Sequence, residues 1–511
     1  MRHIIATLIA CIGAWIGFAN PFIQVPFLIL LFPLGIALCG LFADTPAKAF
    51  RSALIAGALA YGGCMYWVAL PVHDYGNLPW ILAAPCPMLL GVYCGLYTGI
   101  FAAGLRLVQE RLHWLATGLF AAALWTALEA LRGWLFTGFA WLPLSSALVP
   151  VPWLLQAASL IGANALAGLI AGSIAMPVAA RGKAAAVAVS VGVLATISGY
   201  GMMRTAQPLP SDGAISVALV QGNINQAQKW DVTFQNGTVD RYATLTEGAQ
   251  TRDGNTPDLI VWPETALPFY FQETSLMSAR VRKLAREGHT HLLTGAPAYT
   301  PIPDGGGYRM HNRAFLIGPD GSNAGFYDKE HLVPFGEYVP FGEYLPFLNK
   351  LVQGGGDFVP GIKSTPLPAG QMDLGVLICY ETIFPELAQA RVAAGANLLV
   401  NISNDAWFGH SSAPFQHLQM SALRAVEQGR WLVRGTNTGI SAIIDPYGRI
   451  HAHSSLFRAE SVVASGVGLL SVMTPFHRHR TAILTASFAL ALILGGVACL
   501  RPAREQVRVL D

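Results

Sequence analysis

Eight long apolar segments constrain what this chain can fold into. Seven lie within the first 203 residues and the eighth at 481–500. Each approaches or exceeds the roughly 20 residues that a helix needs to cross a bilayer. Only 12% of the residues are charged, whereas soluble domains contain about a quarter. We therefore expect a multi-span membrane bundle of about eight helices. The first seven segments are 4–20, 22–42, 52–70, 79–105, 115–135, 152–180 and 184–202.

Basic residues in the connectors predict the orientation of these spans. Lys and Arg follow the second, fourth and sixth segments, and the connectors 71–78 and 136–151 contain none. Because short cytoplasmic loops are enriched in Lys and Arg, both termini are expected in the cytoplasm. The basic run 477–480, on the predicted outer side, opposes this orientation. The connector residues are Lys48, Arg51, Arg106, Arg111, Arg181 and Lys183, and the tail contains Arg501, Arg504 and Arg508.

A charged pair lies inside the fifth segment. Glu129 and Arg132 are three residues apart, so they share one face of a helix. Charges inside a membrane are costly and usually face the interior of a bundle. We expect the pair either to fix helix packing as an internal ion pair or to contact lipid headgroups.

Residues 204–476 have the pattern of a globular domain. Apolar runs of strand length alternate with helical segments, which predicts α/β layers around one core. The expected domains are a membrane domain at 1–203, this domain at 204–476, and a final span with its tail at 477–511. Strands are expected within 215–224, 258–265, 291–297, 313–321, 375–379 and 397–403, helices at 275–288 and 415–430, and a hairpin at 441–450.

The distribution of cysteines distinguishes Cys379 from the rest. The other six of the seven cysteines lie in apolar stretches, and none has the spacing of a metal site or a disulfide framework. We therefore expect Cys379 to be a free thiol. The formal net charge of +3 is too small to indicate a nucleic-acid partner.

Three polar residues are expected at or near the ends of strands. Cys379 ends the run GVLIC and precedes a helical segment, where unpaired N–H groups and the helix dipole lower a thiol pKa. The ordinary alternative for a lone cysteine is a small buried core residue. Glu264 follows LIVW, and Lys329 lies in YDKEHLVP. A carboxylate can accept the thiol proton and a lysine can stabilise an oxyanion, so the set indicates attack on a carbonyl group.

The motifs WPE, DKxHLVPFGE and CYE, in this order, resemble the three signatures of the nitrilase superfamily of carbon–nitrogen enzymes. The resemblance covers 215–455, including NISNDAWFG at 401–409. It implies an αββα sandwich with Glu264 as general base, Lys329 as oxyanion stabiliser and Cys379 as nucleophile. Supporting or substrate-binding roles are implied for Trp230, Glu337, Tyr380 and Glu381.

The resemblance also implies what these supporting residues do. One of the two glutamates would orient the lysine and the other an acceptor amine. Which glutamate orients which group is left open. Trp230 matches a position tied to substrate handling. Tyr380 would supply a second oxyanion donor through its backbone N–H.

With its membrane spans, the chain resembles the acyltransferases of that superfamily. The implied reaction moves an acyl chain from a membrane phospholipid, through a thioester on Cys379, to the α-amino group of a diacylated apolipoprotein. Such chemistry is expected to need no metal or cofactor. The implied setting is a bacterial inner membrane with a periplasmic catalytic domain, and we expect a monomer.

The segment 333–360 is long and rich in glycine, proline and aromatic residues. Loops of this length are more often functional than neutral. Its apolar side chains are expected to rest on lipid, to cover an apolar pocket that excludes water, or to pack beneath the loop. These side chains are Phe341, Tyr344, Leu345 and Phe347.

Two other functions are compatible with part of this pattern. A membrane-anchored amidase or nitrilase would use the same three residues on a small soluble amide, but would not need aromatic residues beside a bilayer. A transporter or scaffold would carry ionisable pairs on several spans, whereas Glu129 and Arg132 form the one such pair that stands out.

Overall fold

The computed structural model describes residues 1–339, 358–362 and 365–502, and the chain divides into two compact units. The segment predicted to cover a pocket or rest on lipid lies largely outside the described residues, as do Arg504 and Arg508 of the tail. The first unit comprises Met1–Tyr66, Ala84–Gln207 and Pro475–Asp511, and the second comprises Trp67–Ala83 and Pro208–Thr474. The second unit thus includes a short segment from within the predicted membrane domain 1–203.

The first unit is helical, and each predicted apolar segment overlaps a helix. Within the described residues, five helical spans are long and apolar enough to cross a membrane, and a bent helix pair makes a sixth if it counts as one span. The first two predicted spans correspond to shorter apolar helices of 10–17 residues. The main helices are α1 (Arg2–Gly17), α2 (Leu31–Phe42), α3 (Pro46–Cys64), α6 (Cys86–Val108), α7 (Trp114–Arg132), α9 (Ala158–Ala179), α10 (Ala184–Thr205) and α15 (Pro475–Leu500).

Small residues let the first two helices pack closely. A Cβ atom at Gly35 of α2 would lie 2.5 Å from the backbone nitrogen of Ala10 and from the carbonyl oxygen of Ala6, both on α1. Such close backbone approach is typical of helix pairs in membranes, where packing rather than water exclusion drives association.

The charged pair of α7 is buried inside this unit. The Glu129 carboxylate accepts hydrogen bonds from the Trp125 indole N–H at 3.0 Å and from the Leu144 backbone N–H at 2.9 Å. Arg132 donates to the Leu142 carbonyl at 3.3 Å, and its guanidinium lies 5.1 Å from the centre of the Tyr61 ring. These contacts favour the prediction that the pair fixes helix packing.

Two six-stranded sheets form the second unit, which is an α/β sandwich. In each sheet three central strands run parallel and the flanking strands pair antiparallel. The first sheet has the order β12-β1-β2-β3-β4-β5, and the second has β11-β10-β9-β8-β7-β6. The first sheet's strands are β1 (Gly213–Gln221), β2 (Leu259–Val261), β3 (His291–Pro301), β4 (Tyr308–Ile317), β5 (Asn323–Asp328) and β12 (Glu460–Leu469). The second sheet's strands are β6 (Leu367–Ala369), β7 (Met372–Ile378), β8 (Leu398–Ser403), β9 (Leu432–Thr436), β10 (Ala442–Ile444) and β11 (Ile450–His453).

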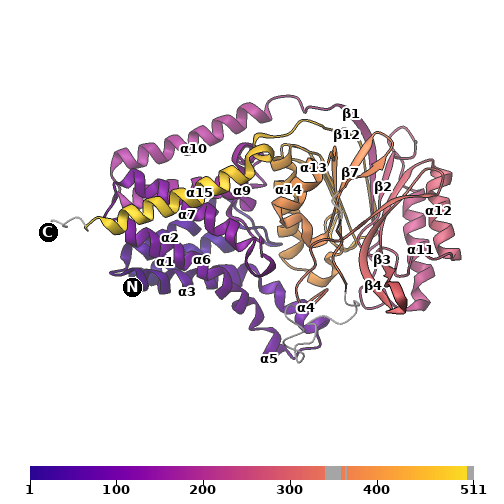
Figure 1. Cartoon of the computed structure of the whole chain (residues 1–511), viewed down its shortest axis with the longest axis horizontal. Helices are drawn as coiled ribbons and strands as arrows, with labels where there is room; N and C mark the ends of the chain where they lie inside the picture. Colours follow the sequence, from indigo (N-terminus) through magenta and orange to yellow (C-terminus); the bar gives the residue numbers. More distant parts are fainter. Residues whose placement is uncertain (340–357, 363–364, 503–511) are drawn as a thin grey trace. The chain divides into compact units, whose positions relative to one another are not determined.

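Helices cover the outer face of each sheet, which gives the predicted αββα order (Figure 1). Helices α11 (Val232–Glu247) and α12 (Leu276–Gly288) lie on the first sheet, and α13 (Pro385–Ala393) and α14 (Ala413–Gln428) lie on the second. Buried apolar side chains from both sheets, such as Val261 and Leu374, form one core between them. A second core lies under α11 and α12.

Local sequence explains where these elements begin and end. In α12 the Ser275 hydroxyl accepts from the Ser278 backbone N–H in a capping box, and His289 ends the helix in the left-handed conformation. The predicted strands, helices and hairpin of this domain are confirmed, with β10 and β11 forming the hairpin. The prediction missed α11 and the strands β5, β6, β9 and β12.

Packing between the sheets makes Leu374 a test of the fold. Replacing fully buried Leu374 with Ala should cost about 2–5 kcal/mol, because it removes buried methyl groups and leaves a cavity. The melting temperature of the purified protein in detergent, followed by tryptophan fluorescence, should fall. Leu276→Ala is the matched control, since Leu276 is 92% exposed, and should change stability by less than about 0.5 kcal/mol. Equal melting temperatures for the two variants would contradict the packing described.

Candidate active site

The structure places the three predicted catalytic residues at or just beyond strand ends. Lys329 directly follows β5, Cys379 directly follows β7, and Glu264 lies three residues beyond β2. All three side chains are buried. The Lys329 Nζ lies 3.5 Å from the Glu264 Oε1, and both charges act on the Cys379 thiol. The structure therefore brings the three together.

Lys329 lies between two carboxylates. Its Nζ is 2.9 Å and 3.0 Å from the two carboxylate oxygens of Glu337, in addition to the contact with Glu264. Burial opposes the positive charge, but the two carboxylates outweigh this effect and raise the pKa of Lys329 above its ordinary value. The lysine is therefore held as a cation in a buried site, where it can stabilise a developing oxyanion.

Asn312 on β4 links the two carboxylates. Its Nδ2 donates to the Glu264 Oε1 at 2.7 Å and to the Glu337 Oε1 at 2.9 Å. The other oxygen of Glu264 accepts from the Asn404 backbone N–H at 2.9 Å. Both oxygens of Glu264 are thus oriented by the protein, which fixes the direction in which it can take a proton.

Cys379 is held in an unusual backbone conformation at the strand end. Its φ angle is +53°, in the left-handed region that costs a non-glycine residue about 1–2 kcal/mol. It is a free thiol, as predicted. Burial, followed by the Glu264 carboxylate, raises the pKa of this thiol, and Lys329 lowers it by a smaller amount. The predicted lowering of the thiol pKa is therefore wrong, because burial outweighs the nearby cation. The thiol is protonated at neutral pH and needs a base.

Glu381 organises the backbone around the site. Its Oε1 accepts from the backbone N–H groups of Glu330 and His331 at 2.7 and 3.0 Å, and its Oε2 accepts from that of Ile378 at 2.6 Å. The Tyr327 hydroxyl also donates to Oε1, at 2.8 Å. This single buried carboxylate ties the chain after Lys329 to the chain before Cys379.

The aromatic candidates occupy different places. Trp230 is 40% exposed and lines a cavity of about 440 Å³ together with Tyr270, Met310 and Phe358, among others. The Tyr380 ring is buried and packs edge-on against Phe384, with centroids 5.0 Å apart.

Sequence reasoning missed two side chains that touch this site. Asn312 had no recognisable signal, because HNR on a strand is an ordinary sequence. Lys229 precedes Trp230, and its buried Nζ lies 3.5 Å from the Glu264 carbonyl oxygen. Burial lowers the pKa of Lys229 to about 8, opposed by the Glu264 charge. A lysine beside an aromatic residue in a polar loop gives no indication of burial.

The αββα sandwich and its buried cysteine, glutamate and lysine, in a chain with several apolar spans, define a membrane-bound protein of the carbon–nitrogen hydrolase class. The family model for carbon-nitrogen hydrolase matches residues 216–465. The model for the apolipoprotein N-acyltransferase N-terminal domain matches residues 11–176.

Individual relatives extend over nearly the whole chain. An apolipoprotein N-acyltransferase of Geobacter metallireducens is 41% identical over 497 residues, which is 95% of this chain and 90% of the relative. One from Azotobacter vinelandii is 35% identical, covering 96% of this chain and 94% of the relative. Among solved structures, Saccharomyces cerevisiae Nit3, a member of branch 10 of the nitrilase superfamily, is 22% identical, with a TM-score of 0.39 over 58% of this chain and 98% of that chain.

The chain therefore belongs to the apolipoprotein N-acyltransferases and is a multi-pass membrane enzyme. This membership favours acyl transfer over the amidase and transporter alternatives.

The raised thiol pKa gives a testable pH dependence. Only the thiolate is alkylated readily, so alkylation of Cys379 by iodoacetamide should still be increasing at pH 10, where a free thiol of pKa about 8.5 is close to its plateau. Peptide mass spectrometry resolves this residue from the other cysteines, with N-acetylcysteine as the reference. Lys329→Met should slow the reaction further at pH 8, because the cation lowers the thiol pKa. A plateau below pH 9 in the wild type would contradict the proposed electrostatics.

Proposed function

We propose that this enzyme transfers an acyl chain from a membrane phospholipid to the α-amino group of the diacylglyceryl-cysteine that begins an apolipoprotein, in two steps. The observation that carries the proposal is the buried ion pair of Lys329 and Glu264 acting on the Cys379 thiol. The relatives are named apolipoprotein N-acyltransferases, which supports the acceptor class, and the motifs WPE, DKEHLVPFGE and CYE are all present.

In the first step Glu264 takes the proton of the Cys379 thiol, and the sulfur attacks the ester carbonyl carbon of the phospholipid. Lys329 stabilises the oxyanion of the tetrahedral intermediate. The carbon–oxygen bond then breaks, and the lysophospholipid leaves with the proton that Glu264 had taken. A thioester on Cys379 remains.

In the second step the acceptor amine attacks the thioester carbonyl carbon. Glu264 takes a proton from the amine, and the carbon–sulfur bond breaks as the amide forms. The proton returns from Glu264 to the thiolate of Cys379, which restores the starting state. In each of the two steps Glu264 receives one proton and then returns it. The hydrogen bonds that hold both of its carboxylate oxygens in place suit this role.

The supporting glutamates divide their work in this proposal. Glu337 orients Lys329, which its two short contacts support. Glu381 positions the backbone on both sides of the site, which its four hydrogen bonds to the protein support. Trp230 would meet substrate at the cavity that it lines.

Both substrates carry acyl chains that remain in a bilayer, which explains why the catalytic residues belong to a chain with membrane spans. We propose that the domain 204–476 lies in the periplasm of a bacterial cell, that both termini are cytoplasmic, and that the enzyme acts as a monomer. The basic connectors support this orientation.

The thioester gives the sharpest test of the mechanism. Wild-type enzyme incubated with phospholipid alone should gain the mass of one acyl chain, located on Cys379 by peptide mapping. Cys379→Ala should gain no acyl chain and should lose transfer completely, and Cys379→Ser should accumulate no long-lived adduct. Retained transfer by a folded Cys379→Ala variant would end the mechanism, as would an adduct on another residue.

The orientation is tested separately. Two reporters are inserted separately in the exposed turn near Gly305: one that is active only in the periplasm, and one that is active only in the cytoplasm. Only the first should be active. Alkaline phosphatase should therefore be active there, and green fluorescent protein should not be fluorescent after export through the general secretory route. The opposite pattern would reverse the proposed topology. The same pair of reporters inserted after Ala180, in a basic connector, provides the reciprocal control.

A further inference from the structure

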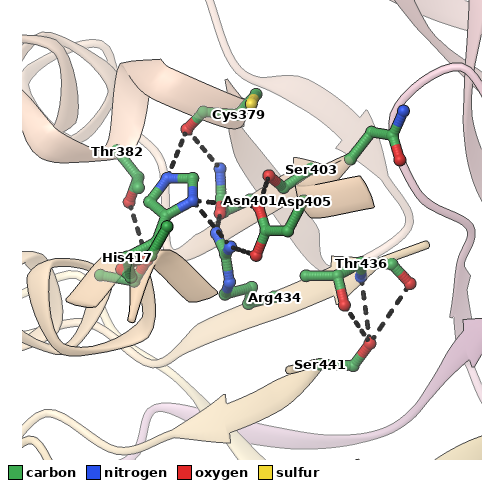
Figure 2. Close-up of polar contacts among 12 residues, drawn as sticks. Cys379, Thr382, Asn401, Ser403, Asp405, His417, Arg434, Thr436 and Ser441 are labelled. Carbon is green, nitrogen blue, oxygen red and sulfur yellow. Dashed lines mark hydrogen bonds and ion pairs between the residues drawn. The ribbon is translucent and has the colours of Figure 1, made fainter. Parts of the chain in front are cut away.

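The backbone carbonyl of the proposed nucleophile points into the protein, away from its own sulfur. Figure 2 shows the Cys379 carbonyl oxygen directed toward His417 and Asn401, with the sulfur on the other side of the residue. The oxygen accepts from the His417 Nε2 at 3.2 Å and from the Asn401 Nδ2 at 3.4 Å. Both side chains are almost completely buried. The left-handed conformation of Cys379 therefore has specific partners that hold it.

His417 is itself held by a buried ion pair. Its Nδ1 lies 3.0 Å from the Arg434 Nη2 and 3.1 Å from the Asp405 Oδ1, and Arg434 binds Asp405 at 2.7 Å. Arg434 also donates to the Asn401 side-chain oxygen, and the Ser403 hydroxyl donates to Asp405 at 2.8 Å. These residues come from β8, the turn after it, α14 and β9. Figure 2 shows them as one connected group behind Cys379.

The chemistry of the acceptor fixes the proton on His417. A carbonyl oxygen can only accept, so the Nε2 must carry a hydrogen in either charge state of the ring. Burial, followed by the Arg434 charge, lowers the pKa of His417. The Nδ1, which faces both the Arg434 Nη2 and the Asp405 Oδ1, takes no part in the hydrogen bond to the carbonyl. Burial opposes the negative charge of Asp405, but Arg434 and His417 outweigh it and lower the pKa of this carboxyl.

The held carbonyl belongs to the same peptide group as the Tyr380 N–H. A peptide group is planar and trans, so its N–H points opposite to its C=O. With the carbonyl directed at His417 and Asn401, the Tyr380 N–H is directed the opposite way within that plane. A hydrogen bond to the carbonyl oxygen also polarises the amide and strengthens its N–H as a donor.

We propose that His417, held by Arg434 and Asp405, is a positioning residue for the oxyanion hole: through the Cys379 carbonyl it fixes and polarises the peptide whose N–H, that of Tyr380, stabilises the tetrahedral intermediate alongside Lys329. His417 acts through this peptide and does not touch the substrate. The inference rests on the proposed acyl transfer at Cys379. It makes the orientation of one backbone amide depend on a side chain 38 positions further along the chain.

Two reactions of the same sulfur separate this role from a purely structural one. Acylation by phospholipid passes through an oxyanion, whereas alkylation by iodoacetamide displaces iodide and forms none. His417→Leu should slow acylation of Cys379 by about 10²–10³-fold, the loss seen when one oxyanion donor is removed. Its alkylation rate should stay within about threefold of wild type, and the KM for phospholipid should change little. Rates come from intact-mass and peptide-mass time courses on the full-length enzyme in detergent.

Matched variants keep the test decisive. His417→Gln places an amide N–H near the position of the Nε2 and should recover most of the acylation rate. His417→Asn is equally polar but too short to reach the carbonyl, and should behave like His417→Leu. If His417→Leu does not fold, the comparison of His417→Gln with His417→Asn replaces it. Met420→Leu, three residues further along α14 and equally buried, is the control and should acylate normally, because the exchange nearly conserves side-chain volume.

The outcomes are distinct. Equal losses of acylation and alkylation would show that His417 only maintains the fold around the thiol, and this would overturn the inference. Equal acylation rates for the Gln and Asn variants would overturn it as well. If wild-type enzyme forms no acyl adduct on Cys379, the proposed function itself fails, whatever the His417 variants do.

Discussion

The contact between Lys329 and its two carboxylates is the interaction on which the site depends. A buried cation is tolerated only where its charge is balanced, and Glu337 and Glu264 supply that balance from within 3.5 Å. Removing one partner of a buried pair typically costs about 3–5 kcal/mol, because the other charge is left without compensation. Asn312 bridges the same two carboxylates. The proposed base and the proposed oxyanion donor are therefore positioned by one another, and neither can be placed correctly without the other.

The strand ends of the sandwich make this contact possible. Glu264 and Lys329 come from the first sheet, Cys379 from the second, and each lies at or just beyond the carboxyl end of its strand. For Glu264 and Cys379 that geometry follows from local sequence, since an apolar run that ends in a polar group predicts a buried strand with a reactive residue at its end. The strand that ends just before Lys329 was not predicted. The sequence therefore predicted the catalytic candidates and most of the strands. Their chemical roles came from the motif resemblance rather than from periodicity.

What the sequence did not predict depends on contacts between residues far apart in the chain. Asn312, His417 and Arg434 lie on elements whose own patterns are ordinary, and their importance arises only when segments distant in the chain come together. The thiol pKa was predicted in the wrong direction because a helix terminus can be recognised locally, whereas the burial that outweighs it is a property of the folded domain. The strand β12 was missed because its partner β1 lies more than 200 residues earlier.

Burial of the thiol has a consequence for how this site can work. A protonated thiol is a poor nucleophile until a base acts on it, so in the proposed mechanism Cys379 becomes reactive when an ester lies beside Glu264 and Lys329. A permanently ionised thiolate would be open to oxidation and alkylation between turnovers. The same buried surroundings strengthen the contacts of Lys329 and the polarisation of the Tyr380 peptide, because electrostatic interactions are stronger where water is excluded. A raised thiol pKa and a strongly preorganised oxyanion site are therefore two effects of one cause, the exclusion of water from the ends of these strands.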